Sequence, residues 1–95
     1  MGPITLEVVC PSGAMLVEKG LDEVVFRRRE PHVEPGSYVS ILPRHGSLLA
    51  RSAAGEISWR RGGAVGAAVA GAGVVEVLDD RVLVLAPDVA RVRSS

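Results

Sequence analysis

The chain has 95 residues and a mass of 9.9 kDa, which is the size of one small domain and excludes a multidomain protein. Its apolar content is 47%, built largely from 16 Val and 11 Ala with only three aromatic residues, and this composition favours sheet over helix. Eleven basic and eleven acidic residues cancel, so the charge provides no long-range attraction to nucleic acids or anionic membranes.

The chain's single cysteine and its lack of targeting signals indicate where it works. Cys10 alone cannot form an internal disulfide, which fits a reducing compartment. The N-terminus lacks the basic and then apolar order of a secretory leader, and the longest apolar stretch, from Ala64 to Val75, is interrupted by glycines and too short to cross a bilayer. We therefore expect a soluble, cytosolic protein.

The first third of the chain predicts three strands. Residues Ile4 to Val9 alternate between apolar and polar side chains, as in a half-buried strand, and the turn residues after Cys10 end it. A second extended segment follows from Ala14 to Lys19, with Gly20 as a break. The β-rich run from Asp22 to Arg28 is the third predicted strand.

The middle of the chain is more irregular. Residues Arg29 to Gly36 contain two prolines and several charges, which predicts an exposed loop. Tyr38 to Leu42 is a short predicted strand that ends at Pro43. Residues Ser47 to Ser52 fit either an extended segment or a single helical turn, and the sequence does not separate the two.

The last third predicts two hairpins. Glu56 to Arg60 is a clearly amphipathic strand, with Ile57 and Trp59 on one face, and Arg61-Gly62-Gly63 connects it to Ala64–Ala70. A helix is the rival interpretation for the alanine-rich run, but its glycines would each cost a helix about 1 kcal/mol, so a strand is preferred. Val74 to Leu78 and Arg81 to Leu85 flank the Asp79-Asp80 turn.

Together these elements predict an all-β fold. The expected architecture is a small antiparallel β-sandwich or flattened barrel of about 7 to 10 short strands, with no C-terminal helical hairpin. Residues 1–90 would form the domain, and residues 91–95 would fray as a charged tail. A domain of this size buries a modest share of its surface, which makes stabilisation by a partner plausible.

Candidate catalytic and ligand-binding residues are sparse. A Cys/His nucleophile would need Cys10 beside His32 or His45, yet a lone cysteine in a small domain is usually a packing residue. His32 could bind a metal with Glu30 and Glu34, but an exposed charged loop explains these residues without one. The prediction is therefore no catalytic residue, no metal, no cofactor and no small-molecule substrate.

Two further patterns, one of glycines and one of aspartates, are also interpreted as structural. The glycines from Gly62 to Gly73 lack the lysine and the following helix of a phosphate-binding loop, and they suit close approach of strands. The Asp79-Asp80 pair lies where a hairpin turn is needed, so it is interpreted as a turn.

The basic clusters and the tryptophan are the remaining candidates. Arg27-Arg28-Arg29 and Arg60-Arg61 lack the net charge and the interleaved aromatic residues of a nucleic-acid groove, so solvated strand ends are the preferred interpretation. A contact with an acidic protein partner stays open. Trp59 is most simply a core residue, and an interface anchor is the alternative.

Four segments in the same order resemble the N-terminal β-sandwich of the epsilon subunit of F-type ATP synthases, which is called delta in mitochondria. They are Leu6–Pro11, Gly36–His45, Gly71–Val77 and Arg81–Ala86, and they span roughly residues 4–90. The most specific part is Ile41-Leu42-Pro43-Arg44-His45, which is similar to an I-L-P-x-H stretch of that family. Tyr38, Ser40 and Ser47 depart from the family pattern, so this loop is expected to meet its neighbour differently.

The resemblance implies a non-catalytic rotor subunit. In that family the sandwich forms the foot of the central stalk, binds the gamma subunit and contacts the loops of the c-ring, on the cytoplasmic face of the bacterial inner membrane. By position, the resemblance implies a c-ring-facing stretch comprising Tyr38, Val39, Ser40, Ile41, Leu42, Pro43, Arg44 and His45. No nucleic acid and no direct membrane insertion are expected.

Several points are left open by the sequence. A stand-alone β-sandwich that binds a peptide or protein, unrelated to rotary ATPases, explains the composition equally well. The coupling ion, proton or sodium, the synthase branch and the face that binds gamma do not follow from these residues.

Overall fold

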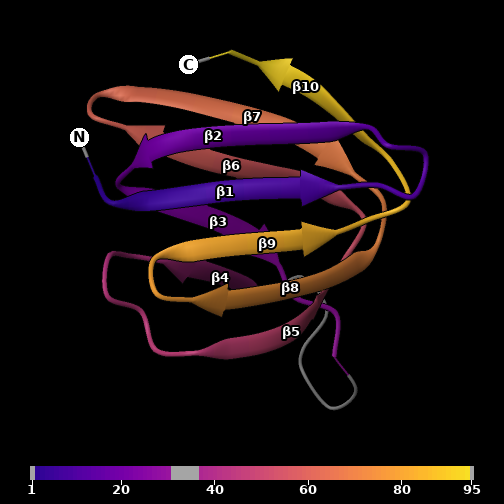
Figure 1. The fold of residues 1–95 in the computed structure, drawn as a ribbon, viewed down its shortest axis with the longest axis horizontal. Coiled ribbons are helices and arrows are strands. Elements are labelled where there is room, and N and C mark those ends of the chain that lie inside the picture. Colours follow the sequence, from indigo (N-terminus) through magenta and orange to yellow (C-terminus); the bar gives the residue numbers. More distant parts are fainter. Residues whose placement is uncertain (1, 31–36, 95) are drawn as a thin grey trace.

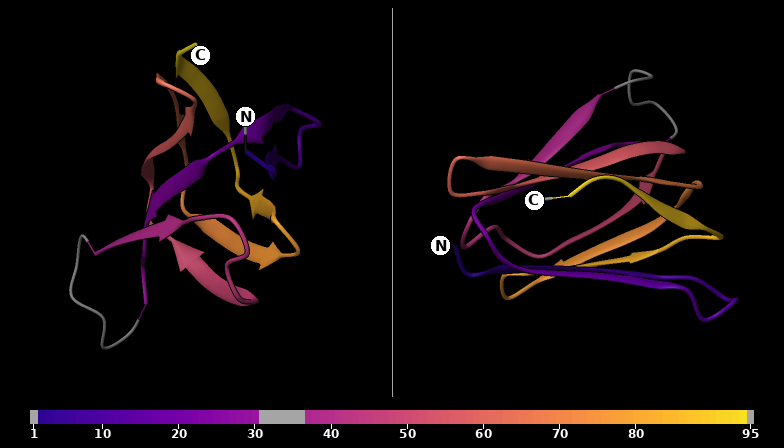
Figure 2. Two further views of the ribbon diagram at one scale, coloured as in Figure 1. Left: turned by 90° about the vertical axis from the view of Figure 1, so that its left-hand side faces the viewer. Right: turned by 90° about the horizontal axis from the view of Figure 1, so that it is seen from above.

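The computed structural model describes residues 2–30 and 37–94, which form two five-stranded sheets packed face to face. Figure 1 shows β2, β1, β9, β8 and β5 in front of the second sheet, and the right-hand view of Figure 2 separates the two layers. We call them sheet A, with strand order β2-β1-β9-β8-β5, and sheet B, with order β10-β7-β6-β3-β4. The strands are β1 Ile4–Val9, β2 Met15–Leu21, β3 Glu23–Arg27, β4 Tyr38–Ile41, β5 Leu48–Ser52, β6 Gly55–Arg61, β7 Ala64–Ala70, β8 Gly73–Leu78, β9 Arg81–Leu85 and β10 Val89–Arg93.

The all-β sandwich is confirmed, and the predicted hairpin strands lie within a few residues of their expected bounds. Period-2 alternation buries one face of each central strand: in β1, Ile4, Leu6 and Val8 are fully buried. The core is one cluster of apolar side chains from both sheets, in which Phe26 and Trp59 are the largest. Valine and alanine supply much of the rest, as the composition predicts.

The sandwich is not wholly antiparallel. β1 runs parallel to β9, with Thr5 opposite Arg81 and Val9 opposite Leu85. A parallel pair needs a long crossover connection, and strands β2 to β8, which belong to both sheets, separate β1 from β9 in the chain. Local sequence patterns detect hairpins between neighbouring strands but not this long-range pairing.

The Gly20 break lies inside a strand instead of between strands. β2 continues to Leu21, and its register with β1 shifts between Ile4 and Leu6. Gly20 has a φ of 72°, a left-handed conformation that glycine adopts without steric cost. The glycine therefore marks a β-bulge where β2 bends toward β3.

The segment that the sequence left open is a strand. Residues Leu48–Ser52 are extended and pair with β8, which excludes the helical turn. The strand preferred for Ala64–Ala70 is confirmed, since it pairs with β6 on one side and β10 on the other. The Asp79-Asp80 turn is confirmed, and both residues have positive φ, as in the two-residue turns that join twisted strands.

The prediction that residues 91–95 fray is wrong for Arg91–Arg93, and Ser95 lies outside the described residues. Val89–Arg93 forms β10, which pairs with β7 from Val89 opposite Ala70 to Arg93 opposite Ala67. Its side chains are mostly exposed, which is why hydrophobic periodicity gave no signal. Backbone pairing to the free edge of β7 holds the strand instead.

Trp59 lies in the core, so the interface-anchor alternative is wrong. Its side chain is 1% exposed, and Gly66 is directly opposite it on β7. A Cβ at Gly66 would lie 2.2 Å from Trp59 Nε1. The glycine therefore provides the space that the indole fills.

Candidate docking surface

The two outer faces of the sandwich differ in polarity. The outer face of sheet A exposes large apolar side chains from four of its strands, β2, β5, β8 and β9. Those with two-fifths or more of their surface exposed are Met15, Val17, Leu49, Val74, Leu78 and Leu85. An exposed apolar area of this kind on one face is typical of a protein interaction site.

Strand register arranges part of this face as a straight line across the sheet. Met15 is opposite Val9, Val9 is opposite Leu85, and Leu85 is opposite Val74. These four residues, here called the apolar row, come from β2, β1, β9 and β8. The next position across, on β5, is Arg51, opposite Val74.

An apolar hollow lies at one end of β1 and β9, beside the apolar row. It has a volume of about 440 Å³, and Val9 and Leu85 belong both to the hollow and to the row. The remaining lining residues, Cys10, Pro11, Ala86 and Pro87, carry no charge. We call this hollow the apolar socket, because its size and lining suit an apolar side chain of a partner.

The outer face of sheet B is polar at its centre. Ser40 donates a hydrogen bond to Glu23, and the Arg60 guanidinium lies 3.6 Å from the Glu23 carboxylate and 3.7 Å from that of Asp22. These partly exposed ion pairs suit contact with water. The outer face of sheet A also carries an ion pair, Glu7 with Arg81, but its exposed apolar side chains come from four strands, which makes it the candidate docking face.

The stretch Tyr38–His45 spans the edge strand β4 and the loop after it. Tyr38 is 69% exposed and lies under the Arg27 guanidinium, which is 5.8 Å from the ring centre. Ser40 and Leu42 are also exposed, whereas Val39 packs against the core and Ile41 is fully buried. Ile41 therefore supports the strand and offers no side chain to a partner.

Hydrogen bonds hold the loop after β4 against the β8–β9 turn. The backbone N–H of Arg44 donates to Asp80 Oδ1 at 2.6 Å, and the N–H of His45 donates to the Leu42 carbonyl at 3.2 Å. Arg44 has a φ of 64°, which a tight turn requires. The exposed Pro43 and Arg44 side chains are thus presented on a fixed backbone.

The geometry separates Cys10 from His45. His45 follows Arg44, which is bonded to Asp80, and the Asp80 carbonyl accepts from Thr5 at the start of β1. Cys10 follows the other end of this strand, five residues from Thr5, which is roughly 17 Å in an extended chain. Cys10 is also buried, so these residues do not form a nucleophile and base pair.

No group of three potential ligands able to hold a metal occurs in the part of the chain that the structure describes. The predicted candidates His32 and Glu34 lie outside the described residues. Glu30 accepts a hydrogen bond from the backbone N–H of Arg51 at 2.8 Å, so its carboxylate has a structural partner.

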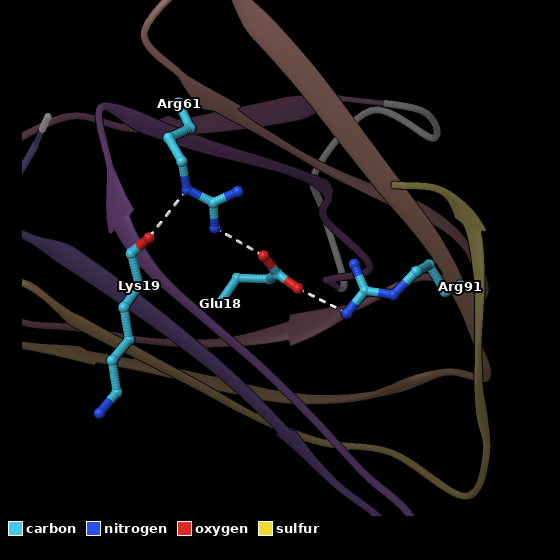
Figure 3. A network of polar contacts seen from close by, with 4 residues as sticks. All are labelled: Glu18, Lys19, Arg61 and Arg91. Carbon is cyan, nitrogen blue, oxygen red and sulfur yellow. Dashed lines mark hydrogen bonds and ion pairs between the residues drawn. The ribbon is translucent and has the colours of Figure 1, made fainter. Parts of the chain in front are cut away.

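A polar network closes the open side between β2 and β10. Glu18, on β2, accepts hydrogen bonds from Arg61 at 2.6 Å and from Arg91, which lies on β10 (Figure 3). Arg61 also donates to the Lys19 carbonyl at 3.0 Å. Burial alone raises the pKa of Glu18, but the hydrogen bonds and charges of both arginines outweigh it and hold the pKa below its ordinary value. The guanidinium of Arg91 also lies over the Trp59 ring, 5.6 Å from its centre.

Sequence reasoning missed the apolar row and the Glu18 network. One signal for the row was available: Val82 to Leu85 is apolar at successive positions, as expected of a strand that is apolar on both faces. No local sequence pattern predicts the contact of Glu18 with Arg61 and Arg91, because these residues belong to three strands far apart in the sequence.

Relatives confirm the resemblance. The ATP synthase epsilon chains 1 and 2 of Syntrophotalea carbinolica are each 38% identical to the chain over 84 residues, which is 86% of the chain. The chain is a relative of the ATP synthase epsilon chains across its β-sandwich. No family model matches it.

Solved structures share the fold of this epsilon-like sandwich. A chain in the Euglena gracilis mitochondrial ATP synthase, in a structure of OSCP, F1 and c-ring, superposes with a TM-score of 0.76 at 16% identity, covering 96% of this chain and 54% of its own length. A chain in the structure of the Tetrahymena thermophila mitochondrial ATP synthase central stalk and c-ring superposes with a TM-score of 0.69 at 14% identity. It covers 93% of this chain and 66% of its own length. At such identities the likeness establishes the fold.

The chain spans about half the length of the epsilon chains it matches, 54% in each case. No helix long and apolar enough to cross a membrane occurs among residues 2–30 and 37–94.

Proposed function

We propose that the chain is a non-catalytic rotor subunit of an F-type ATP synthase that couples the c-ring to the gamma subunit during ion-driven ATP synthesis. The observation that carries this proposal is the 38% identity to ATP synthase epsilon chains across nearly the whole β-sandwich. The separation of Cys10 from His45 agrees with a subunit that acts by docking. The place of action would be the cytoplasmic face of a bacterial inner membrane, as a peripheral part of the synthase.

The outer face of sheet A is the proposed binding face for gamma. The apolar row and the apolar socket form a continuous surface, because Val9 and Leu85 belong to both. Apolar side chains at the centre of an interface contribute most of the binding free energy. On sheet B the exposed Val65 and Val69 both lie on β7, and Val65 is opposite Arg60, which forms ion pairs with Asp22 and Glu23.

The exposed residues of the stretch Tyr38–His45 are the proposed contacts to the c-ring. Tyr38, Leu42, Pro43 and Arg44 project from β4 and its loop, and this stretch carries the most specific part of the family resemblance. Ile41 is excluded as a direct contact because it is buried. The hydrogen bond from Arg44 to Asp80 gives the loop the stiffness that a torque-bearing contact requires.

Co-purification with the gamma subunit of the same synthase tests the proposal. The wild-type chain should be recovered with gamma, and Leu85→Asp should abolish recovery by placing a charge in the apolar row. Val65→Asp is the matched control, because Val65 has a similar exposure on the outer face of sheet B. Binding should survive that control.

Two results would contradict the proposal. A folded wild-type chain that does not bind gamma would favour a stand-alone interaction module. Equal losses in the two variants would contradict the assignment of the gamma-binding face to sheet A.

A further inference from the structure

Arg29 and Arg51 form a charged corner at the end of the apolar row. Together with Glu30 and the backbone around Gly73, they line an open hollow of about 500 Å³. The backbone N–H of Arg29 donates to the Arg51 carbonyl at 2.9 Å, which holds the two residues side by side although they are far apart in sequence. We call this feature the arginine corner.

The corner contains unused hydrogen-bonding capacity. Both arginine side chains are exposed, and neither has an ion-pair partner among the described residues. Glu30, the only acidic residue among the described residues that line the hollow, accepts a hydrogen bond from the Arg51 backbone N–H. By contrast, Arg60, Arg61, Arg81 and Arg91 are all paired with carboxylates.

The arginine corner adjoins the apolar row of the docking face. Arg51 is the β5 residue opposite Val74, so it continues the apolar row, and Val74 itself lines the corner's hollow. A partner lying across the row therefore reaches Arg29 and Arg51 at its end. Guanidinium groups present paired donors that match a carboxylate, which makes an acidic side chain the chemical complement.

We infer that the arginine corner selects a gamma-subunit segment in which an acidic residue follows an apolar anchor. This inference rests on the proposed function and adds the chemistry of the partner to it. From Leu85 to Arg51 is two strand spacings, roughly 10 Å. On a helix lying across the strands, with a rise of about 1.5 Å per residue, the carboxylate would lie about seven residues from the anchor.

Charge reversal with a measured dissociation constant for gamma tests the inference. The double variant Arg29→Glu with Arg51→Glu should weaken binding at least tenfold at low ionic strength and should flatten the salt dependence. The matched control is Arg60→Glu with Arg93→Glu, which makes the same change in net charge on sheet B and should stay within twofold of wild type. Arg29→Gln with Arg51→Gln should give an intermediate loss, and circular dichroism establishes that each variant is folded.

The outcomes separate this inference from the proposed function. If gamma binds the wild type and Leu85→Asp abolishes binding, but the Arg29/Arg51 reversal behaves like wild type, only the inference is overturned. Equal losses in the two charge-reversal pairs would also overturn it, as would tight binding of inorganic phosphate at the corner without any effect on gamma affinity. Absence of gamma binding by the folded wild type would overturn both.

Discussion

At the scale of single residues, the fit of Trp59 against Gly66 is a close side-chain contact that one substitution can test. Gly66→Ala would place a methyl group 2.2 Å from Trp59 Nε1 and 2.3 Å from Cε2. The buried indole has little room to move, so we expect a loss of about 1–3 kcal/mol in the free energy of unfolding. Thermal unfolding followed by circular dichroism measures this loss.

Gly63→Ala provides the control for that substitution. No atom lies within 4 Å of a Cβ at Gly63, so its unfolding temperature should stay close to that of wild type. Replacing Trp59 with Leu in the Gly66→Ala background should recover part of the lost stability. Equal unfolding temperatures for Gly66→Ala and Gly63→Ala would show that β7 moves away at little cost.

The sequence predicted one half of this contact. The alternation of Ile57 and Trp59 indicated a buried face for the strand, and the structure confirms it. The role of Gly66 could not be predicted, because it depends on register. Only the pairing of β6 with β7 places that glycine opposite the indole.

At the scale of elements, hydrogen bonds to the Glu18 carboxylate connect β2 of sheet A to β10 and to the end of β6 (Figure 3). Its pKa is lower in the folded chain than the ordinary value of 4.5, so the ionised form is favoured by folding. The resulting stabilisation is complete above the unfolded-state pKa and is lost as the pH falls through the lower folded-state pKa. Wild type should therefore lose stability progressively as the pH falls from about 4.5.

Glu18→Gln should remove this contribution. At neutral pH we expect a loss of about 1–3 kcal/mol, since two charge-assisted hydrogen bonds lose their acceptor charge. Below pH 4.5, its unfolding free energy should fall less steeply than that of wild type. Urea titrations at a series of pH values measure both effects.

Glu7→Gln is the matched control for Glu18→Gln. Glu7 pairs with Arg81 at 2.9 Å, but the arginine side chain is 59% exposed, so this surface ion pair contributes about 1 kcal/mol or less. If both variants lost the same stability, the closure of the β2–β10 side would depend on something other than the Glu18 carboxylate.

Elements joined by short turns were the predictable ones. The glycines of Arg61-Gly62-Gly63 and the aspartates of the Asp79-Asp80 turn indicated two hairpins, both of which are present. Pairing between distant strands was not predictable, and it accounts for the parallel β1–β9 pair and for β10. The candidate docking surface depends on the same long-range pairing, since β1 connects Met15 to Leu85 across the sheet.

At the scale of the whole molecule, the sandwich is closed on both open sides. The Glu18 network spans one of them. On the other, the chain beyond β3 pairs with β5: Arg28 bridges to Ser52, and the Ala53 N–H donates to the Arg27 carbonyl at 2.8 Å. The two sheets are therefore joined along their edges as well as through the core, which suits a part that transmits force without deforming.

Such a closed body should be stabilised as a unit when its outer face is covered. A partner that binds only the folded state contributes RT ln(1 + [L]/Kd), which is about 2.7 kcal/mol when free gamma is at 100 times its Kd. For a domain of this size, that corresponds to a rise of roughly 10–20 °C in unfolding temperature. Because Trp59 and Glu18 lie away from the outer face of sheet A, Gly66→Ala and Glu18→Gln should gain as much free energy as wild type. Thermal unfolding with and without gamma measures these gains in stability. Leu85→Asp should show no gain. A smaller gain for Gly66→Ala than for wild type would mean that the core and the docking face are coupled.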